Sequence, residues 1–387
     1  MRKVAVIMGS WAHPRTTITF KALGSNYSTV VIAAKRCSVV GATDIGIPVR
    51  RLVALRDITR HIPKIRNRFR WGSDQYLFGF EKALEDVDVV VPSSATCFFA
   101  YQAARYCEKT GKPLVLQEQE NIPFVDLDRS MYPRRSYVLS VARRIATLTE
   151  RAKLSLILEG VPSEKIRVLR RGIDTELFHP RARESGLREK LGFTQDQTVI
   201  LFAGRIVWSK GIWEFVHAAK LLLDDPAVKQ CNPTFLIVSA GGKVAAVKER
   251  IRYLNISEHV KIMNSVPFDQ MPTVYGVADI FVAPSAATPL WQEQWGLVIS
   301  EAMATGTPVI TTLSGAIPEV IGEAGVLVQP SDTYALLDAL KRLVCDVEKR
   351  KALGEAGRAR VVEECDWRTV GSRYADLIDE ACAEGAN

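Results

Sequence analysis

The chain has 387 residues, of which 47% are hydrophobic and 24% charged, with a formal net charge of +8 and a pI near 9.1. This composition is typical of a globular protein, and the length suits two domains that each bury a core, which excludes disordered and fibrous classes. No apolar run reaches the length of a membrane-spanning helix, and no signal-peptide pattern precedes the first strand, so we expect a cytoplasmic protein.

In the first half, short apolar runs alternate with helix-like segments. Continuous apolar strands separated by helices predict a parallel sheet that is covered on both faces. The strands of this half are expected at residues 4–8, 29–34, 87–91, 114–117, 154–158 and 166–169.

Two loops of this half are candidates for an acceptor site or reaction centre. Gly9 and Ser10 end the first strand and lead to His13, and glycine there allows a ligand to approach the backbone, although a plain tight turn fits equally well. Glu118 and Glu120 follow the strand at 114–117 and either contact a ligand or form polar surface.

Basic residues crowd residues 50–70 and are followed at once by aromatic side chains, and a second basic cluster lies between 134 and 153. Cations beside aromatic rings suit an anionic membrane surface or a lipid-phosphate acceptor, which would place the protein peripherally on the membrane. A solvated basic face is the alternative. The same composition would suit nucleic acid, but no nucleic-acid-binding motif accompanies it, so we expect no nucleic-acid partner.

The span from 172 to 194 has no strong hydrophobic period and contains Pro180, Gly186 and Gly192, as expected for a domain boundary. We therefore predict domains at 1–175 and 176–366. In the second half the expected strands are 199–203, 235–239, 260–263, 280–283, 309–312 and 326–328. The predicted fold class is α/β, with two Rossmann-like doubly wound domains and a cleft between them that would hold a ligand.

A first motif follows the strand at 198–203. Gly204 ends that strand, and Arg205 and Lys210 bracket the loop before a helix-like segment at 212–223. Two cations and the loop amides could clamp a diphosphate. Because cations at a helix N-terminus oppose the helix dipole, a bound anion explains them better than an ordinary surface does.

A second motif occupies 289–308 and holds Glu293 and Glu301. A helix that starts near Gly296 would leave the backbone N–H groups of Trp295, Gly296 and Leu297 for a phosphate, while the two carboxylates accept sugar hydroxyls. The pair follows a strand of the α/β unit, where ligands usually bind. This predicts a nucleotide-sugar pocket; solvated glutamates are the alternative.

Cysteine and histidine give no sign of a metal site. The seven cysteines have no C-x-x-C spacing and the five histidines form no pair at metal-ligand spacing. Neither a P-loop nor a complete G-x-G-x-x-G fingerprint is present. We expect reduced thiols, no metal and no cofactor.

Taken in order, the motifs at 171–180, 204–211, 293–301, 314–319 and 325–328 resemble the retaining glycosyltransferases of family 4, which have the GT-B fold. The resemblance implies a metal-independent transfer of a sugar from a nucleotide-diphosphate sugar to an acceptor glycan or lipid-linked acceptor, with retention of configuration. It also implies that a terminal helix at 367–387 packs back on the first domain.

The resemblance implies roles for individual residues. Arg205 and Lys210 would stabilise the departing diphosphate, Glu293 would contact hydroxyls of the donor sugar, and Glu301 the ribose. Backbone atoms of Asn264, Ser265 and Val266 would meet the base. Many members carry a histidine where this chain has residues 117–121, so Glu118 or Glu120 would take that position beside the sugar or acceptor.

Two other functions remain open from the sequence. A nucleotide-sugar epimerase or hydrolase of the same fold would act on the donor without an acceptor. A non-catalytic nucleotide-sugar-binding protein would bind the donor without turnover.

Overall fold

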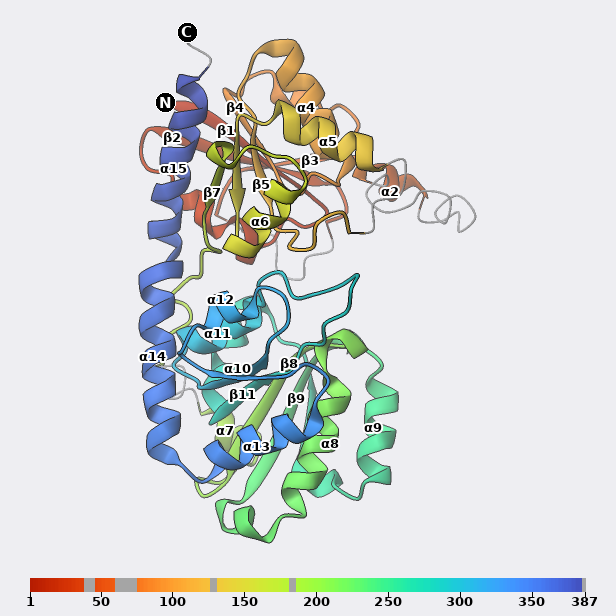
Figure 1. Ribbon diagram of the computed structural model, residues 1–387, viewed down its shortest axis with the longest axis vertical. Helices are drawn as coiled ribbons and strands as arrows, with labels where there is room; N and C mark the ends of the chain where they lie inside the picture. Colours follow the sequence, from red (N-terminus) through yellow and green to blue (C-terminus); the bar gives the residue numbers. More distant parts are fainter. Residues whose placement is uncertain (38–45, 60–74, 126–130, 181–185, 385–387) are drawn as a thin grey trace. The chain divides into compact units, whose positions relative to one another are not determined.

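The computed structural model describes residues 1–37, 46–59, 75–125, 131–180 and 186–384 (Figure 1). The chain divides into two compact units: unit 1 is Met1–Gly172 together with Trp367–Asn387, and unit 2 is Ile173–Asp366. Each unit consists of parallel strands flanked by helices, so the predicted α/β class with two Rossmann-like domains is confirmed.

Unit 1 holds two short sheets whose strands run parallel. The first has the order β3-β2-β1-β4 and the second β5-β6-β7, and isolated parallel bridges from Val90 to Leu114 and from Ser93 to Gln117 link β4 to β5. The strands are β1 (Arg2–Gly9), β2 (Tyr27–Ala34), β3 (Val49–Leu52), β4 (Val89–Pro92), β5 (Val115–Glu118), β6 (Arg144–Thr147) and β7 (Ile166–Val168).

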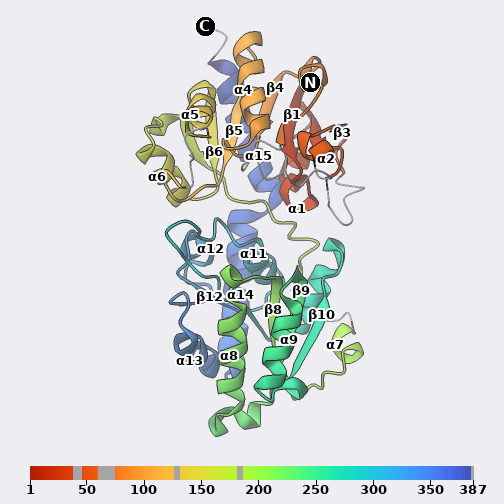
Figure 2. The ribbon, with the colours of Figure 1, turned by 90° about the vertical axis from the view of Figure 1, so that its right-hand side faces the viewer.

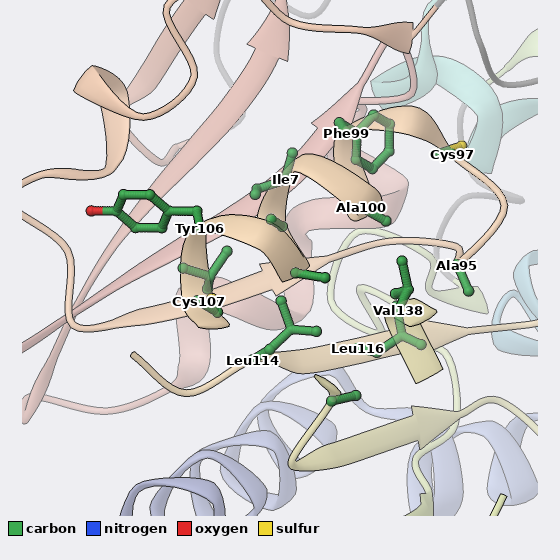
Figure 3. Packing of buried hydrophobic residues seen from close by; sticks show 14 of the residues in the cluster. Ile7, Ala95, Cys97, Phe99, Ala100, Tyr106, Cys107, Leu114, Leu116 and Val138 are labelled. Atoms are coloured by element: carbon green, nitrogen blue, oxygen red, sulfur yellow. The ribbon is translucent and has the colours of Figure 1, made fainter. Parts of the chain in front are cut away.

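The helices of unit 1 cover both faces of its strands. On one face, Phe99, Ala100 and Cys107 of α4 pack with Ile7, Leu114 and Leu116 (Figure 3). On the other face, α15 packs against η1, β5 and β6. The helices are α1 (Pro14–Thr17), η1 (Ile18–Ala22), α2 (Leu55–Thr59), η3 (Lys82–Leu84), α4 (Phe98–Thr110), α5 (Met131–Val141), α6 (Glu150–Leu158), η4 (Ser163–Lys165) and α15 (Trp367–Ala383).

The strand predicted at 154–158 is wrong, because these residues belong to helix α6. Thr149 caps that helix: its Oγ1 accepts a hydrogen bond from Ala152 N at 3.1 Å. Within the run, Ser155 and Leu156 are buried whereas Leu154 and Leu158 are exposed, which is a helical rather than an alternating pattern.

Unit 2 has one parallel sheet with the order β10-β9-β8-β11-β12-β13. This is a doubly wound order whose direction reverses between β8 and β11, the position at which such sheets bind ligands. Its strands are β8 (Thr198–Ile206), β9 (Pro233–Gly242), β10 (Val260–Asn264), β11 (Ile280–Ala283), β12 (Val309–Thr312) and β13 (Val326–Val328).

Helices α8, α9 and α13 bury one apolar face of this sheet. Helices α8 and α9 lie side by side (Figure 2), and α11 contacts α14. The helices of unit 2 are α7 (Leu187–Lys190), η6 (Trp208–Lys210), α8 (Ile212–Leu223), η7 (Pro226–Cys231), α9 (Val244–Tyr253), η8 (Ser257–His259), η9 (Phe268–Gln270), α10 (Met271–Val277), α11 (Leu297–Ala304), α12 (Ile317–Ile321), α13 (Thr333–Val344) and α14 (Val347–Cys365).

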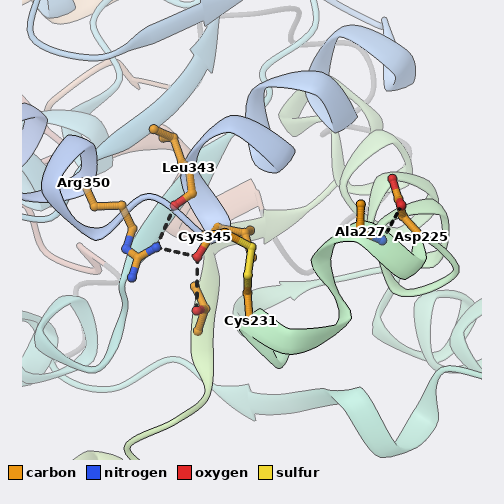
Figure 4. The surroundings of a disulfide bond; sticks show 8 residues. Asp225, Ala227, Cys231, Leu343, Cys345 and Arg350 are labelled. Atoms are coloured by element: carbon orange, nitrogen blue, oxygen red, sulfur yellow. Dashed lines mark hydrogen bonds between the residues drawn. A yellow bond between two sulfur atoms is a disulfide. The ribbon is translucent and has the colours of Figure 1, made fainter.

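A disulfide joins Cys231, at the end of η7, to Cys345, the C-cap of α13 (Figure 4). Their Cα atoms lie 5.5 Å apart, a separation that a disulfide spans without backbone movement. The expectation that every cysteine is a reduced thiol is therefore wrong for this pair. With a sequence separation of 114, the two cysteines give no local spacing signal.

None of the helices in the described ranges is both long enough and apolar enough to cross a membrane.

Candidate functional site

Both sequence motifs of unit 2 lie at the carboxyl edge of its sheet, beside the reversal of strand order. Gly204 and Arg205 are among the last residues of β8, and Lys210 ends η6 directly after it. The second motif follows β11, which pairs with β8 through Ile280 and Ile200. Parallel pairing therefore brings together segments that are about 80 residues apart in the sequence.

Lys210 and Glu293 meet directly. The Lys210 Nζ lies 2.5 Å from the Glu293 Oε2, and the Ser285 hydroxyl donates to the same oxygen at 3.1 Å. The pair is largely buried, with 25% of the Lys210 side chain and 13% of the Glu293 side chain exposed. The Lys210 ammonium also lies 5.3 Å from the centroid of the Trp291 ring, within range of a cation–π contact.

Arg205 differs from Lys210. Its side chain is exposed at the same edge and makes no ion pair or hydrogen bond with the part of the chain that the structure describes. A guanidinium in this position can donate two parallel hydrogen bonds to a phosphate.

The loops that carry Lys210 and Glu293 are fixed to each other. Gly211 has φ 69°, and a Cβ at this position would lie 1.8 Å from the Pro284 carbonyl oxygen, so only glycine allows the two backbones to approach this closely. Ala286 N donates to Ser209 O at 3.0 Å across the same junction.

A row of buried hydroxyls, which we call the hydroxyl row (Thr311, Thr312 and Ser314), holds the chain between β11 and Glu293. The hydroxyls of Thr311, Thr312 and Ser314 donate to the carbonyls of Ala283, Ser285 and Ala286 at 2.7, 2.6 and 2.7 Å. Further along, Ala316 N donates to the Glu293 carbonyl at 2.8 Å. The backbone that presents the Glu293 carboxylate is therefore set by the end of β12.

Glu301 lies inside α11 and is only 1% exposed. The Tyr275 hydroxyl, also buried, donates to the Glu301 Oε2 at 2.7 Å. Helix α11 begins at Leu297 after the N-cap Gly296, whose φ of 82° is in the left-handed region. Trp295 is packed inside the unit, where its Nε1 donates to the Ser300 Oγ at 3.1 Å, so its bulk does not cover the start of the helix.

Asn264, Ser265 and Val266 lie at the carboxyl end of the edge strand β10. Asn264 and Ser265 are exposed, and Ser265 N donates to Ser239 O at 2.8 Å. Because β10 is separated from β8 by one strand, this segment lies roughly 10 Å along the sheet edge from Arg205. That separation suits the two ends of a nucleoside diphosphate.

In unit 1, the loop after β1 is occupied by local contacts. A Cβ on Gly9 would lie 2.7 Å from a Phe99 ring carbon, and the Ser10 hydroxyl donates to the Gln75 Oε1 at 2.8 Å. His13 caps α1, with its Nδ1 accepting from Arg15 N at 3.0 Å. Burial, helped by the charge of Arg15, lowers the pKa of His13 to about 4, so its imidazole is neutral at pH 7.

Glu118 lies in the interior of unit 1. Its carboxylate accepts from Arg135 Nη1 at 2.8 Å and from Ala95 N at 2.9 Å, and Arg135 Nε also pairs with Glu159 at 2.7 Å. Burial acts to raise the pKa of Glu118, but the Arg135 charge and the backbone N–H bonds outweigh it and lower that pKa. Glu120 is half-buried, and burial together with the Glu118 charge raises its pKa.

The structure adds residues to which the sequence analysis gave no role: Ser285, Trp291, Tyr275 and the hydroxyl row. Ser285 lies after β11 in a Pro-Ser pair, but nothing in the sequence links it to Glu293. Over the described ranges, no three His, Cys, Asp or Glu side chains are grouped so that they could hold a metal ion.

Comparison with known proteins adds independent findings. Residues 184–360 match the family model described as glycosyl transferases group 1. A GDP-mannose-dependent alpha-(1-6)-phosphatidylinositol monomannoside mannosyltransferase of Mycolicibacterium smegmatis is 32% identical over 227 residues, 56% of this chain and 57% of the relative. A D-inositol 3-phosphate glycosyltransferase of Streptosporangium roseum is 29% identical over 296 residues, 71% of this chain and 66% of the relative. The chain thus spans little more than half the length of the first of these relatives.

Among solved structures, that of Anabaena HepE in complex with UDP and glucose aligns with a TM-score of 0.77 at 17% identity, over 98% of this chain and 100% of that one. Sucrose-phosphate synthase from Thermosynechococcus elongatus aligns with a TM-score of 0.73 at 18% identity, over 99% and 100%. At these identities the likeness shows the fold alone, and it confirms the expected GT-B class.

Proposed function

We propose that this chain, whose residues 184–360 match the glycosyl transferases group 1 family model, transfers a hexose-type sugar from a nucleotide-diphosphate sugar to an acceptor glycan or lipid-linked acceptor. The transfer retains the anomeric configuration and uses no metal ion. One observation carries the proposal: Arg205, Lys210 and Glu293 converge at the carboxyl edge of unit 2, beside the start of α11.

In this proposal, positive charge stabilises the leaving diphosphate. Arg205, Lys210 and the first N–H groups of α11 face the negative charge that grows as the glycosidic bond breaks, a role that a divalent cation fills in metal-dependent transferases. Removal of either cation should lower kcat/KM by about 10²–10³-fold, the effect of one lost oxyanion donor.

The other residues hold the rest of the donor. Glu293 accepts hydrogen bonds from hydroxyls of the sugar, and Glu301 contacts the ribose. Backbone atoms of Asn264, Ser265 and Val266 contact the base. The name of the M. smegmatis relative gives GDP-mannose as its donor, and the HepE structure contains UDP and glucose. We therefore propose GDP-mannose and UDP-glucose as the first donors to test.

The test is a thermal-shift screen with GDP, UDP, GDP-mannose and UDP-glucose, followed by turnover assays with and without EDTA. A ligand that binds only the folded protein raises its melting temperature. We expect stabilisation by one nucleotide series, turnover that survives EDTA, and loss of turnover in Arg205→Met and Lys210→Met. Inversion at the anomeric carbon of the product, or loss of activity on chelation, would contradict the proposal.

The two alternatives make different predictions in the same assays. A nucleotide-sugar epimerase or hydrolase would consume the donor at full rate without an acceptor. A non-catalytic binding protein would be stabilised by the donor and would release no nucleoside diphosphate with any acceptor.

We also propose that the protein is cytoplasmic and binds anionic membranes peripherally. Residues 60–70 of the basic stretch lie outside the described residues. Within the described part, the Arg50 Nη1 lies 2.6 Å from the Asp86 Oδ1, whereas the half-buried Arg134 guanidinium lies 5.0 Å from the Phe98 ring centroid. The Phe98 ring centroid in turn lies 5.4 Å from that of Tyr76, so one cation contacts a pair of aromatic rings here.

Sedimentation with vesicles tests the membrane proposal. We expect more protein to bind vesicles containing anionic lipid than neutral vesicles, and we expect salt to release it. Equal binding to both kinds of vesicle would refute the proposal.

A further inference from the structure

The Lys210–Glu293 ion pair joins two groups to which the proposed function gives different tasks. Lys210 binds the diphosphate and Glu293 binds the sugar, yet the ammonium lies 2.5 Å from the carboxylate. A diphosphate that reaches the same ammonium brings at least two negative charges next to Glu293. Neighbouring negative charges repel each other strongly in a partly buried site. The diphosphate and the Glu293 carboxylate therefore compete for the Lys210 ammonium.

We propose that Lys210 exchanges Glu293 for the donor's diphosphate, and that the released Glu293 carboxylate makes the site prefer a complete nucleotide sugar over a nucleoside diphosphate. The inference rests on the proposed function, because it takes the same residues as the donor site. It adds a rule for how that site distinguishes substrate from product.

Lys210 is the partner that moves. The Glu293 backbone is fixed by the Ala316 N–H bond to its carbonyl, and the Ser285 hydroxyl holds its carboxylate at 3.1 Å. Lys210 instead carries its charge on a flexible four-carbon chain. The ammonium can therefore turn toward a diphosphate while Glu293 stays in place, still bound by Ser285.

The exchange has opposite consequences for the two ligands. A nucleoside diphosphate draws the ammonium away from a carboxylate that is only 13% exposed, which is unfavourable. A nucleotide sugar takes the ammonium and supplies hydroxyl donors to the same carboxylate. The pair therefore weakens binding of the product nucleoside diphosphate once the sugar has left, and this favours its release.

Isothermal titration with GDP, UDP, GDP-mannose and UDP-glucose tests the inference in the wild-type chain and in Glu293→Gln. The amide keeps the size of the side chain and removes the charge. The variant should bind the nucleoside diphosphate about three- to tenfold more tightly than wild type does, the coupling expected of neighbouring charged groups. Its preference for the nucleotide sugar over the nucleoside diphosphate should fall by about tenfold or more.

Asp224→Asn is the matched control. Asp224 also pairs with a lysine, Lys220 Nζ at 2.6 Å, and it follows the far end of α8, roughly 18 Å along the helix from the site. The control removes one negative charge from the same unit, so it measures the long-range effect on an anionic ligand. We expect both affinities to stay within about twofold of wild type, because exposed charges beyond a Debye length are screened.

The outcomes separate the two proposals. If wild type binds none of the four ligands, the proposed function fails. Suppose instead that wild type binds these ligands. If the affinity of Glu293→Gln for the nucleoside diphosphate is then no higher than that of wild type or of Asp224→Asn, the exchange is refuted and the donor site stands. If Glu293→Gln does not fold, Glu293→Asp replaces it, because the shorter side chain withdraws the carboxylate by one methylene. This variant should bind the nucleoside diphosphate more tightly than wild type, by a smaller factor than expected for Glu293→Gln. An unchanged affinity would refute the exchange.

Discussion

Replacement of Gly211 by alanine tests whether the two loops of the site must touch. Gly211 has φ 69°, and an added Cβ would lie 1.8 Å from the Pro284 carbonyl oxygen, where real contacts exceed 3.0 Å. The left-handed conformation alone costs an alanine about 1–2 kcal/mol. Relief of the overlap requires movement of more than 1 Å, and overpacking of this kind costs a further ~1–3 kcal/mol. We therefore expect the free energy of unfolding of unit 2 to fall by about 2–5 kcal/mol.

Gly111→Ala is the control, because Gly111 has nearly the same φ, 71°, and nothing lies within 4 Å of its added Cβ. It should lose only the conformational cost, about 1–2 kcal/mol. Thermal and urea unfolding measure both variants. Because the movement separates Lys210 from Glu293, kcat/KM should also fall by about 10²-fold in Gly211→Ala alone. If the two variants were equally stable and equally active, the close contact between Gly211 and Pro284 would not be needed to position Lys210 and Glu293.

Three further predictions concern residues outside the sequence motifs. Tyr275→Phe leaves the Glu301 Oε2 without its buried hydroxyl donor, so unfolding should become easier by about 1–3 kcal/mol and donor affinity should fall; an unchanged melting temperature would contradict this. Arg135→Met leaves the buried carboxylates of Glu118 and Glu159 without their cation and should cost about 3–5 kcal/mol. Because folding lowers the pKa of Glu118 below its ordinary 4.5, its ionised form stabilises wild type above that pH, and urea titrations should show this contribution disappearing as the pH falls below 4.5. Reduction of the Cys231–Cys345 disulfide, which closes a loop with a sequence separation of 114, should cost about 4–5 kcal/mol in the chain-entropy model, and Cys231→Ser should make the melting temperature insensitive to reductant.

The sequence predicted the fold of unit 2 well because its central strands, such as β11 and β12, are buried along their whole length. All six expected strands of the second half lie within or overlap β8–β13. In unit 1, β3 and β6 were missed because each contains arginine (Val49-Arg-Arg-Leu52 and Arg144-Ile-Ala-Thr147), so neither reads as a continuous apolar run. β3 and β6 become strands because they pair with β2 and β5, respectively, and this tertiary pairing cannot be read from their own residues.

The general position of the candidate site could also be predicted, since parallel strands place their carboxyl ends at one edge. The contacts within it could not. The Lys210–Glu293 pair, the Tyr275–Glu301 hydrogen bond and the hydroxyl row all depend on the register between strands that are distant in sequence. Glu118 shows the converse: its position after a strand suggested a ligand contact, while Arg135, 17 residues later, engages it in the interior.

Helix α15 has a consequence for the synthesis of this protein. Its Val370, Tyr374 and Ile378 complete the apolar layer that covers one face of the unit 1 strands, although nearly two hundred residues of unit 2 are translated first. While the ribosome makes those residues, the apolar face of the unit 1 strands lacks its covering helix, and the nascent chain is prone to aggregate through it. A fragment ending at Gly172 should therefore aggregate on expression, whereas co-expressing residues 367–384 as a separate peptide should rescue part of it.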